Sequence, residues 1–213
     1  MILTYYCIIT MIIIAYLLGS IPSAVWIGKK YYGIDIREHG SKNAGTTNML
    51  RVLGKRAALP VFGLDVLKGF VAVTIIDLMK YDSVFADGAN ETWFYILRFI
   101  AVFAAVLGHI FPIFAGFRGG KGVAVTCAWL MLYLPVTGVL CCLAGGVAVL
   151  LTGYLPVGAV LIAALAVPVG WLQYGTEAGA VLALNAVIMV TRHWAGLQRI
   201  HRGEELQFFR PKL

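Results

Sequence analysis

Long apolar segments separated by short polar ones make up nearly the whole of this 213-residue chain. A helix needs about 20 predominantly apolar residues to cross the hydrocarbon core of a bilayer. Seven stretches reach or approach that length and are predicted to span the membrane: Leu3–Ile27, Ala57–Met79, Trp93–Ala115, Val123–Leu134, Val136–Leu151, Tyr154–Trp171 and Ala178–Thr191. The fourth and fifth are short and meet at Pro135, so they form two spans, one kinked helix or a re-entrant pair. The pattern predicts an all-α, polytopic membrane protein with about seven transmembrane helices.

The composition favours the same class. The chain is 61% hydrophobic and 13% charged, with a mean hydropathy of +0.87, whereas soluble domains are nearer half apolar and a quarter charged. The first apolar run is long enough to span and has no basic region before it, so we expect a retained helix rather than a cleaved signal. We therefore treat residues 1–213 as a single integral-membrane domain.

The basic residues predict the orientation of the chain. Fifteen of the seventeen Lys and Arg residues lie in three segments, namely 29–68, 118–121 and 192–212, which seven spans place on one face. The other face carries few cations beside several acids: Lys80, Arg98, Asp82, Asp87, Glu91 and Glu177. Because Lys and Arg concentrate on the cytoplasmic side, the N-terminus is predicted outside and the C-terminus in the cytoplasm. The net charge of +7 then requires no nucleic-acid partner.

The first basic segment, Gly33–Arg56, holds hydroxyl and amide side chains between glycines, followed by a cation: Ser41, Asn43, Thr46, Thr47, Asn48 and Arg51. Backbone N–H groups, hydroxyls, amides and nearby cations together suit an oxyanion, above all phosphate. The alternative is a solvated loop that merely follows the charge rule, and the residues alone leave both readings open.

The second basic segment, FRGGKG at Phe117–Gly122, interrupts two apolar stretches with glycines and two cations. Its glycines allow close approach to a ligand and positive φ angles: Gly119, Gly120 and Gly122. Lys121 is a point charge able to reach a phosphate. The apolar residues that follow predict a helix, so the loop lies at a helix N-terminus, where anions are favoured. It is not a Walker A loop, because Ala115 stands where the first glycine would be.

Several ionisable side chains lie at the edges of the spans. His193, at the end of the last span, either caps a helix or binds phosphate and takes a proton. His109 ends the third span, where it binds substrate or caps the helix. Asp65 and Lys68 are three residues apart on one helix face, so we expect a structural ion pair. No motif indicates a metal site, a covalent nucleophile or a cofactor.

Four ordered motifs resemble those of the bacterial acyl-phosphate:glycerol-3-phosphate acyltransferases, over nearly the full length. They read GSIPSAVWIGK at Gly19–Lys29, GSKNAGTTNMLR at Gly40–Arg51, GHIFPIFAGFRGGKGVAV at Gly108–Val125 and HWAGLQRIHRGEE at His193–Glu205, with DVLKG at Asp65–Gly69 following the second. Three positions depart from the pattern: Lys42 replaces a glycine, Thr46 an alanine and Gly196 an asparagine. The last removes a side chain able to bond a substrate oxygen.

The resemblance implies transfer of a fatty acyl group from acyl phosphate to the 1-hydroxyl of glycerol 3-phosphate, giving lysophosphatidic acid and phosphate. It implies catalytic roles for Ser41, Arg51, Lys121 and His193, and substrate binding by Asn43, Thr47, Asn48, His109, Gly119, Gly120 and Gly122. It further implies a bacterial inner-membrane enzyme facing the cytoplasm, in contact with membrane lipid and functionally linked to a soluble enzyme that makes the acyl phosphate. No cofactor or metal is expected.

Two alternatives remain open from the sequence. A transporter of an anionic or phosphorylated solute would also combine spans with basic loops, although here the polar groups lie at the cytoplasmic rim rather than at mid-bilayer. A catalytically silent, lipid-binding relative is the other alternative, and Gly196 keeps it open.

Overall fold

The computed structural model describes residues 2–79 and 91–208, which leaves Lys80, Asp82, Asp87 and Lys212 outside the described residues. Two compact units make up the chain, Met1–Trp129 and Leu130–Leu213. Every regular element in the described ranges is helical. The all-α class predicted from the sequence is therefore confirmed.

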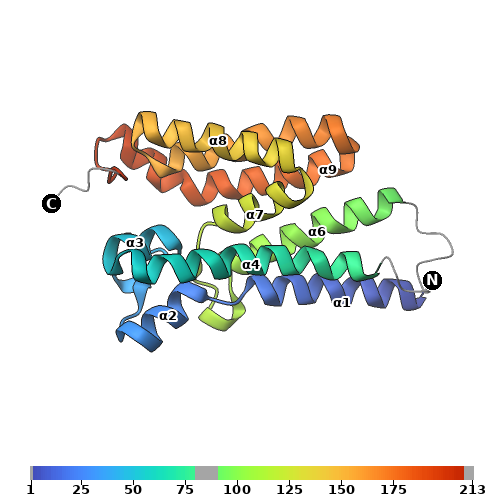
Figure 1. Ribbon diagram of the computed structural model, residues 1–213, viewed down its shortest axis with the longest axis horizontal. Coiled ribbons are helices and arrows are strands. Elements are labelled where there is room, and N and C mark those ends of the chain that lie inside the picture. Colours follow the sequence, from blue (N-terminus) through green and yellow to red (C-terminus); the bar gives the residue numbers. More distant parts are fainter. Residues whose placement is uncertain (1, 80–90, 209–213) are drawn as a thin grey trace. The chain divides into compact units, whose positions relative to one another are not determined.

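In the first unit, the long apolar helices α1, α4 and α6 lie side by side (Figure 1). The elements are α1 (Ile2–Gly19), α2 (Ser23–Tyr32), η1 (Ile36–Glu38), α3 (Thr46–Leu53), α4 (Lys55–Met79), α6 (Glu91–Ile110), η2 (Ile113–Ala115) and α7 (Val123–Tyr133), which continues into the second unit. Glycines bring α1 and α6 together, since a Cβ on Gly19 would run into Ala105 O and one on Gly108 into Tyr16 O. Small residues permit such backbone contact between membrane helices.

The first predicted span is interrupted. Leu3–Ile27 was expected as one helix, but α1 ends at Gly19 and α2 begins at Ser23. Pro22 lacks an N–H group and cannot continue the hydrogen-bond ladder of α1. In this break the carbonyl of Ile21 accepts hydrogen bonds from the Ser23 N–H and from Lys68 Nζ, both at 3.0 Å. The third predicted span, Trp93–Ala115, is likewise divided between α6 and η2 by Pro112.

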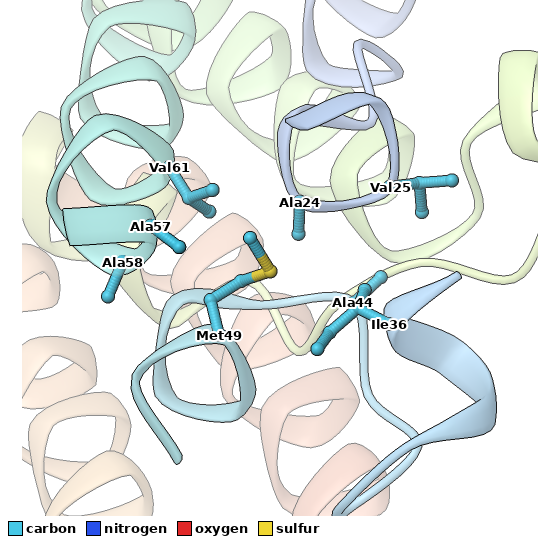
Figure 2. Close-up of a cluster of buried hydrophobic side chains, with 8 residues drawn as sticks. All are labelled: Ala24, Val25, Ile36, Ala44, Met49, Ala57, Ala58 and Val61. Atoms are coloured by element: carbon cyan, nitrogen blue, oxygen red, sulfur yellow. The ribbon is translucent and has the colours of Figure 1, made fainter. Parts of the chain in front are cut away.

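A small core fixes the polar segment to the membrane helices (Figure 2). Met49 of α3, fully buried, points toward Ala57 and Val61 of α4 and toward Ala24 of α2. Ile36 of η1 is also fully buried in this cluster. The segment between α2 and α4 is therefore folded and packed, so the reading of Gly33–Arg56 as a merely solvated loop was wrong.

The second unit contains α8 (Pro135–Thr152) and α9 (Leu155–His201). Inside α9, Gly175 has φ 86° and ψ −172°, a conformation open to glycine alone. The two halves of α9 fold back on each other, because a Cβ on Gly179 would meet Trp171, one on Gly170 would meet Leu182, and one on Gly196 would meet Pro156. α9 is thus an antiparallel hairpin whose arms correspond to the predicted spans Tyr154–Trp171 and Ala178–Thr191.

Within the described ranges, five helical segments are long and apolar enough to cross a membrane: Tyr5–Tyr32, Lys55–Leu78, Ile96–Ala115, Pro135–Thr152 and Leu155–His201. The 47-residue Leu155–His201 segment contains both arms of the hairpin. α7 has 11 residues and is about 16 Å long, half of the hydrocarbon thickness. A multi-pass membrane protein is therefore confirmed, whereas the number of spans and the orientation stay predictions.

Candidate functional site

Asn48 stabilises the conformation of the Gly33–Arg56 segment through buried hydrogen bonds. Its side chain is fully buried at the start of α3. The amide Nδ2 donates to Ile36 O at 3.0 Å and to His39 O at 2.9 Å, and Oδ1 accepts from the Ser41 N–H at 2.9 Å. Three such bonds make the amide a clamp for the loop that carries Ser41. Its predicted contact with substrate stays a prediction.

The other predicted residues of this segment are more accessible. Ser41 is exposed, and Asn43, Thr47 and Arg51 are half-buried. Thr47 and Arg51 are four residues apart on α3, so they share one helix face. Thr46 Oγ1, by contrast, is buried with no hydrogen-bond partner among the described residues. The hydroxyl of Thr47 and the guanidinium of Arg51 are therefore better placed than Thr46 to receive a ligand.

The FRGGKG loop joins η2 to α7 and closes onto the end of α6. Gly119 N–H donates to Ile110 O at 3.2 Å, and Gly120 N–H donates to His109 O at 3.0 Å. These two amides therefore bond within the protein, which corrects their expected use as a phosphate cradle. Gly119 and Gly120 also lack the positive φ expected of them, which Gly122 alone of the three glycines shows, at 85°. Their missing side chains instead admit the neighbouring backbone, since a Cβ on Gly119 would collide with His109 O.

α7 begins at Val123, directly after Gly122, as the sequence predicts. The first turn of a helix leaves N–H groups without intrahelical partners. In α7 these are the N–H groups of residues 123–125. The N–H of Thr126 is the first that bonds along the helix, to Gly122 O at 2.9 Å. Lys121 is half-buried and immediately precedes this turn. The N-terminus of α7 and the ammonium group of Lys121 therefore lie next to each other at the end of this loop.

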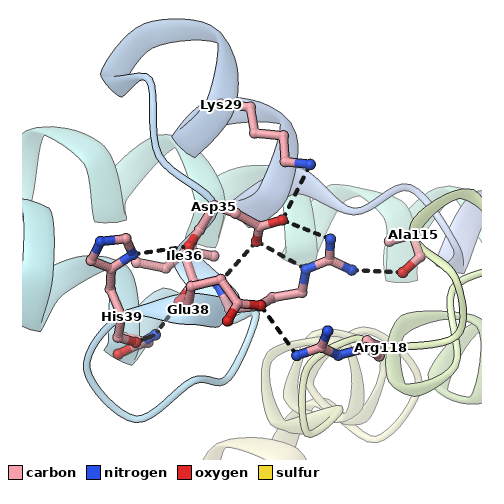
Figure 3. Close-up of polar contacts among 9 residues, drawn as sticks. Lys29, Asp35, Ile36, Glu38, His39, Ala115 and Arg118 are labelled. Carbon is pink, nitrogen blue, oxygen red and sulfur yellow. Dashed lines mark hydrogen bonds and ion pairs between the residues drawn. The ribbon is translucent and has the colours of Figure 1, made fainter.

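The two polar loops lie against each other within the first unit. A Cβ on Gly120 would sit 3.0 Å from Ala44 O. Arg37 Nη1 donates to Ala115 O at 2.6 Å, and Arg118 lies 3.4 Å from the Glu38 carboxylate (Figure 3). Residues 80 positions apart in the sequence are thus held together at one end of the unit. The structure therefore joins the two segments that the sequence singled out separately.

An ion cluster on η1 orders this junction. Asp35 accepts two side-chain hydrogen bonds from Arg37, at 2.9 and 2.7 Å, and Lys29 Nζ lies 3.2 Å from Asp35 Oδ2. The hydrogen bonds from Arg37 hold the pKa of the Asp35 carboxyl well below its usual range, and Asp35 in turn raises the pKa of Arg37. Both charges therefore persist throughout the physiological pH range, and Arg37 stays positioned to reach Ala115.

His109 lies beneath the FRGGKG loop and beside the predicted ion pair. Asp65 Oδ1 is 2.8 Å from Lys68 Nζ and 3.6 Å from His109 Nδ1, and all three side chains are buried. The predicted pairing of Asp65 with Lys68 is confirmed. The participation of His109 was not predicted, because the contact joins α4 to α6 and leaves no periodic signal in the sequence.

His193 belongs to the second unit, on α9. It is buried, and its Nδ1 lies 2.8 Å from Met189 O. A carbonyl oxygen only accepts, so Nδ1 is the donor of this hydrogen bond. Arg199 Nε pairs with Glu205 Oε2 at 2.6 Å one turn beyond Gly196. The predicted role of His193 beside the two loops of the first unit stays a prediction.

No group of three His, Cys, Asp or Glu side chains gathers closely enough to hold a metal ion in the part of the chain that the structure describes. The two adjoining loops of the first unit carry hydroxyls, helix N-terminal N–H groups, guanidinium and ammonium groups. Such donors suit a phosphorylated ligand rather than a cation.

Known proteins are similar to this chain in sequence over most of its length. A model of the family described as glycerol-3-phosphate acyltransferase matches residues 9–203. The glycerol-3-phosphate acyltransferase of Halalkalibacterium halodurans is 38% identical over 207 residues, covering 95% of this chain and 96% of the relative. That of Bacillus cereus strain G9842 is 38% identical over 188 residues, 88% of each chain. The Enterococcus faecalis protein of the same name is 48% identical over 128 residues, 60% of this chain and 54% of that relative.

The fold is also similar to that of solved structures. PlsY, described as an integral membrane glycerol 3-phosphate acyltransferase, superposes in its glycerol 3-phosphate form with a TM-score of 0.79 and 29% identity over 94% of both chains. Its lysophosphatidic acid form gives a TM-score of 0.76 and 28% identity over the same shares. The family match over residues 9–203, the relatives covered almost end to end and the shared helical fold show that this chain belongs to the glycerol-3-phosphate acyltransferase family, as an integral membrane protein similar to PlsY.

Proposed function

We propose that the chain transfers a fatty acyl group from an acyl phosphate to the 1-hydroxyl of glycerol 3-phosphate. The observation that carries the proposal is the junction of the two polar loops, tied by Arg37 to Ala115 and packed at Gly120 against Ala44. Two phosphorylated substrates must meet for this reaction, and the junction brings together the two segments to which we assign anion binding. The family's name and the two ligand forms of PlsY support glycerol 3-phosphate as acceptor and lysophosphatidic acid as product.

The reaction needs no protein nucleophile. The hydroxyl oxygen of glycerol 3-phosphate attacks the acyl carbonyl carbon, the bond from that carbon to the phosphate oxygen breaks, and the hydroxyl proton passes to a base. Lysophosphatidic acid and inorganic phosphate result. Because an acyl phosphate is already an activated anhydride, the protein has to position two anions and stabilise developing charge.

The residues divide into two groups. Ser41, Asn43, Thr47 and Arg51 bind one phosphate, with Asn48 shaping their loop. Lys121 and the first turn of α7 bind the other and stabilise charge on the carbonyl oxygen and the leaving phosphate. The proton goes either to His193 or to the phosphate of the substrate itself.

The location of the site at the membrane surface suits one lipid substrate and one soluble substrate. The acyl tail stays in the lipid while the phosphate loops face the cytoplasm at the inner membrane of a bacterium. Clustered Lys and Arg offset the repulsion between two anionic substrates. A soluble enzyme that makes the acyl phosphate supplies the donor, and neither coenzyme A nor acyl carrier protein takes part directly.

The test uses purified protein in detergent or vesicles, with acyl phosphate and glycerol 3-phosphate. We expect equal amounts of lysophosphatidic acid and phosphate, and no product with acyl coenzyme A as donor. Lys121→Ala is expected to lower kcat about 10²–10³-fold, because one electrostatic contact in the transition state is worth that much. Lys30→Ala, which removes an exposed lysine of α2, is the matched control and keeps activity. Folded wild-type protein without product, or a fully active Lys121→Ala, contradicts the proposal.

A further inference from the structure

Three ionisable side chains form a buried chain between α4 and α6. Asp65, Lys68 and His109 are 2%, 5% and 7% exposed. Asp65 Oδ1 lies 2.8 Å from Lys68 Nζ and 3.6 Å from His109 Nδ1. Burying such groups is expensive, and a buried ion pair is often no more stable than apolar residues of the same volume. Stability alone therefore does not account for this arrangement.

Each end of this chain is attached to an irregular part of the backbone. Lys68 Nζ donates to Ile21 O at 3.0 Å, in the break between α1 and α2. At the other end, His109 O accepts the Gly120 N–H at 3.0 Å. The imidazole lies directly under the same residue, since a Cβ on Gly120 would collide with His109 Nε2. One carboxylate thus connects the end of α1 to the backbone that precedes Lys121.

We propose that Asp65 and Lys68 are positioning residues: they orient the His109 imidazole, which supports the FRGGKG backbone and thereby sets the position of Lys121 and the start of α7. The catalytic consequence rests on the proposed function, whereas the structural consequence does not. On this account His109 acts through the loop and does not itself bind substrate. The Asp65 carboxylate acts on the ring through charge at 3.6 Å rather than through a hydrogen bond, and Lys68 holds that carboxylate in place.

The test separates positioning from stability by removing both charges at once. Asp65→Asn alone leaves the Lys68 ammonium buried without its counter-ion and is expected to destabilise the protein. The double variant Asp65→Asn/Lys68→Met removes that problem but still lacks the carboxylate. The matched control is Asp77→Asn/Arg98→Met, which removes an ion pair that joins α4 to α6 away from the loop. All variants are full-length proteins in detergent.

We expect the double variant to unfold within a few degrees of wild type while kcat falls about 10²-fold, since a small misplacement of catalytic groups has that effect. KM for both substrates should change less than about threefold. Hydrogen exchange of the amides at 117–122 should rise about tenfold, without a comparable rise elsewhere. The control pair should leave kcat and the exchange of this loop near wild type.

Recovery of both stability and kcat in the double variant overturns the proposal, as does unchanged exchange at 117–122. If the double variant fails to fold, His109→Phe tests the same link, because it keeps a ring of similar size and leaves the Asp65–Lys68 pair intact. Wild-type kcat and exchange in His109→Phe would then overturn it. If the wild-type protein makes no product, the proposed function fails, and the exchange measurement alone decides the positioning role.

Discussion

Lys42 lies at a left-handed backbone position, with φ 58°, and its side chain is exposed. An L-residue with a Cβ is strained by about 1–2 kcal/mol in this region, which explains why glycine is usual here in the family. We expect Lys42→Gly to raise the free energy of unfolding by about 0.5–1 kcal/mol, after the greater flexibility of glycine in the unfolded chain is subtracted. Thermal unfolding in detergent measures this. Lys42→Ala removes the same side chain but keeps the strain, so an equal gain from alanine would contradict the explanation.

Gly196 shows how the chain accommodates the loss of the family asparagine. The residue is buried, and a Cβ there would lie 2.8 Å from Pro156 Cγ on the opposite arm of the α9 hairpin. Restoring the side chain by Gly196→Asn is therefore expected to lower the free energy of unfolding by about 1–3 kcal/mol, the usual effect of overpacking. The double variant Gly196→Asn/Pro156→Ala should regain most of this loss. Stability of the single variant equal to wild type would show that the hairpin opens to admit the asparagine.

At the residue scale, the sequence located the residues of the candidate site more successfully than it assigned their individual roles. Residue type alone cannot tell an amide that binds a ligand from one that ties a loop, and Asn48 is a clamp. Nor can it tell a glycine that approaches a ligand from one that admits its own backbone, as Gly119 and Gly120 do. The link from Asp65 to His109 depends on the packing of α4 against α6, which the sequence does not encode locally.

At the scale of elements, the ion cluster around Asp35, which links η1 to η2, leads to a prediction about pH. Asp35 binds Arg37, and Arg37 reaches Ala115 on the other loop. We expect Asp35→Asn to lower the free energy of unfolding at neutral pH by about 1 kcal/mol, a modest value because the ion cluster is partly exposed to solvent. Glu38→Gln is the control, since its pair with Arg118 is exposed and should contribute little.

The sign of the pH dependence follows from the depressed pKa of Asp35. The folded state binds the Asp35 proton less readily than the unfolded chain does. The stabilisation is therefore complete above the ordinary carboxyl pKa of about 3.9 and is lost as the pH falls toward the lower, folded value. The difference in stability between wild type and Asp35→Asn should stay constant from about pH 8 to 5 and shrink below about pH 4. A difference that grows on acidification would disprove this role of Asp35.

The apolar pattern predicted where the helices lie but not where they break. Length and hydropathy locate α4 and α8 to within two residues, but the second arm of α9 continues ten residues beyond the predicted end at Thr191 and α6 ends five residues before the predicted Ala115. Pro22 and Pro112 lie inside apolar runs, so hydropathy continues across them while the hydrogen-bond ladder stops. α3 was missed because it has eight residues within a polar segment, and it depends on Met49 packing against α2 and α4.

For the whole molecule, the open question is whether α7 and α8 cross the membrane once or twice. With seven spans, five of them separate Ser41 from Glu177, so these residues lie on opposite faces, and Ser41 shares a face with His201. If α7 and α8 form a single span, Ser41 and Glu177 lie on the same face, whereas a re-entrant pair leaves them on opposite faces, as seven spans do. All three side chains are exposed.

Labelling of single cysteines decides whether α7 and α8 together form a single span. In a background without the four native cysteines, we expect a membrane-impermeant maleimide to label Glu177→Cys in intact cells, and Ser41→Cys and His201→Cys only after permeabilisation. Labelling of Ser41→Cys and Glu177→Cys from the same side would rule out seven spans. The proposed role of His193 as the base requires the Gly40–Arg51 loop and the end of α9 on one face, because His193 and Ser41 otherwise cannot reach the same substrates. Labelling that places Ser41 and His201 on opposite faces would exclude His193 and leave the substrate phosphate as the base.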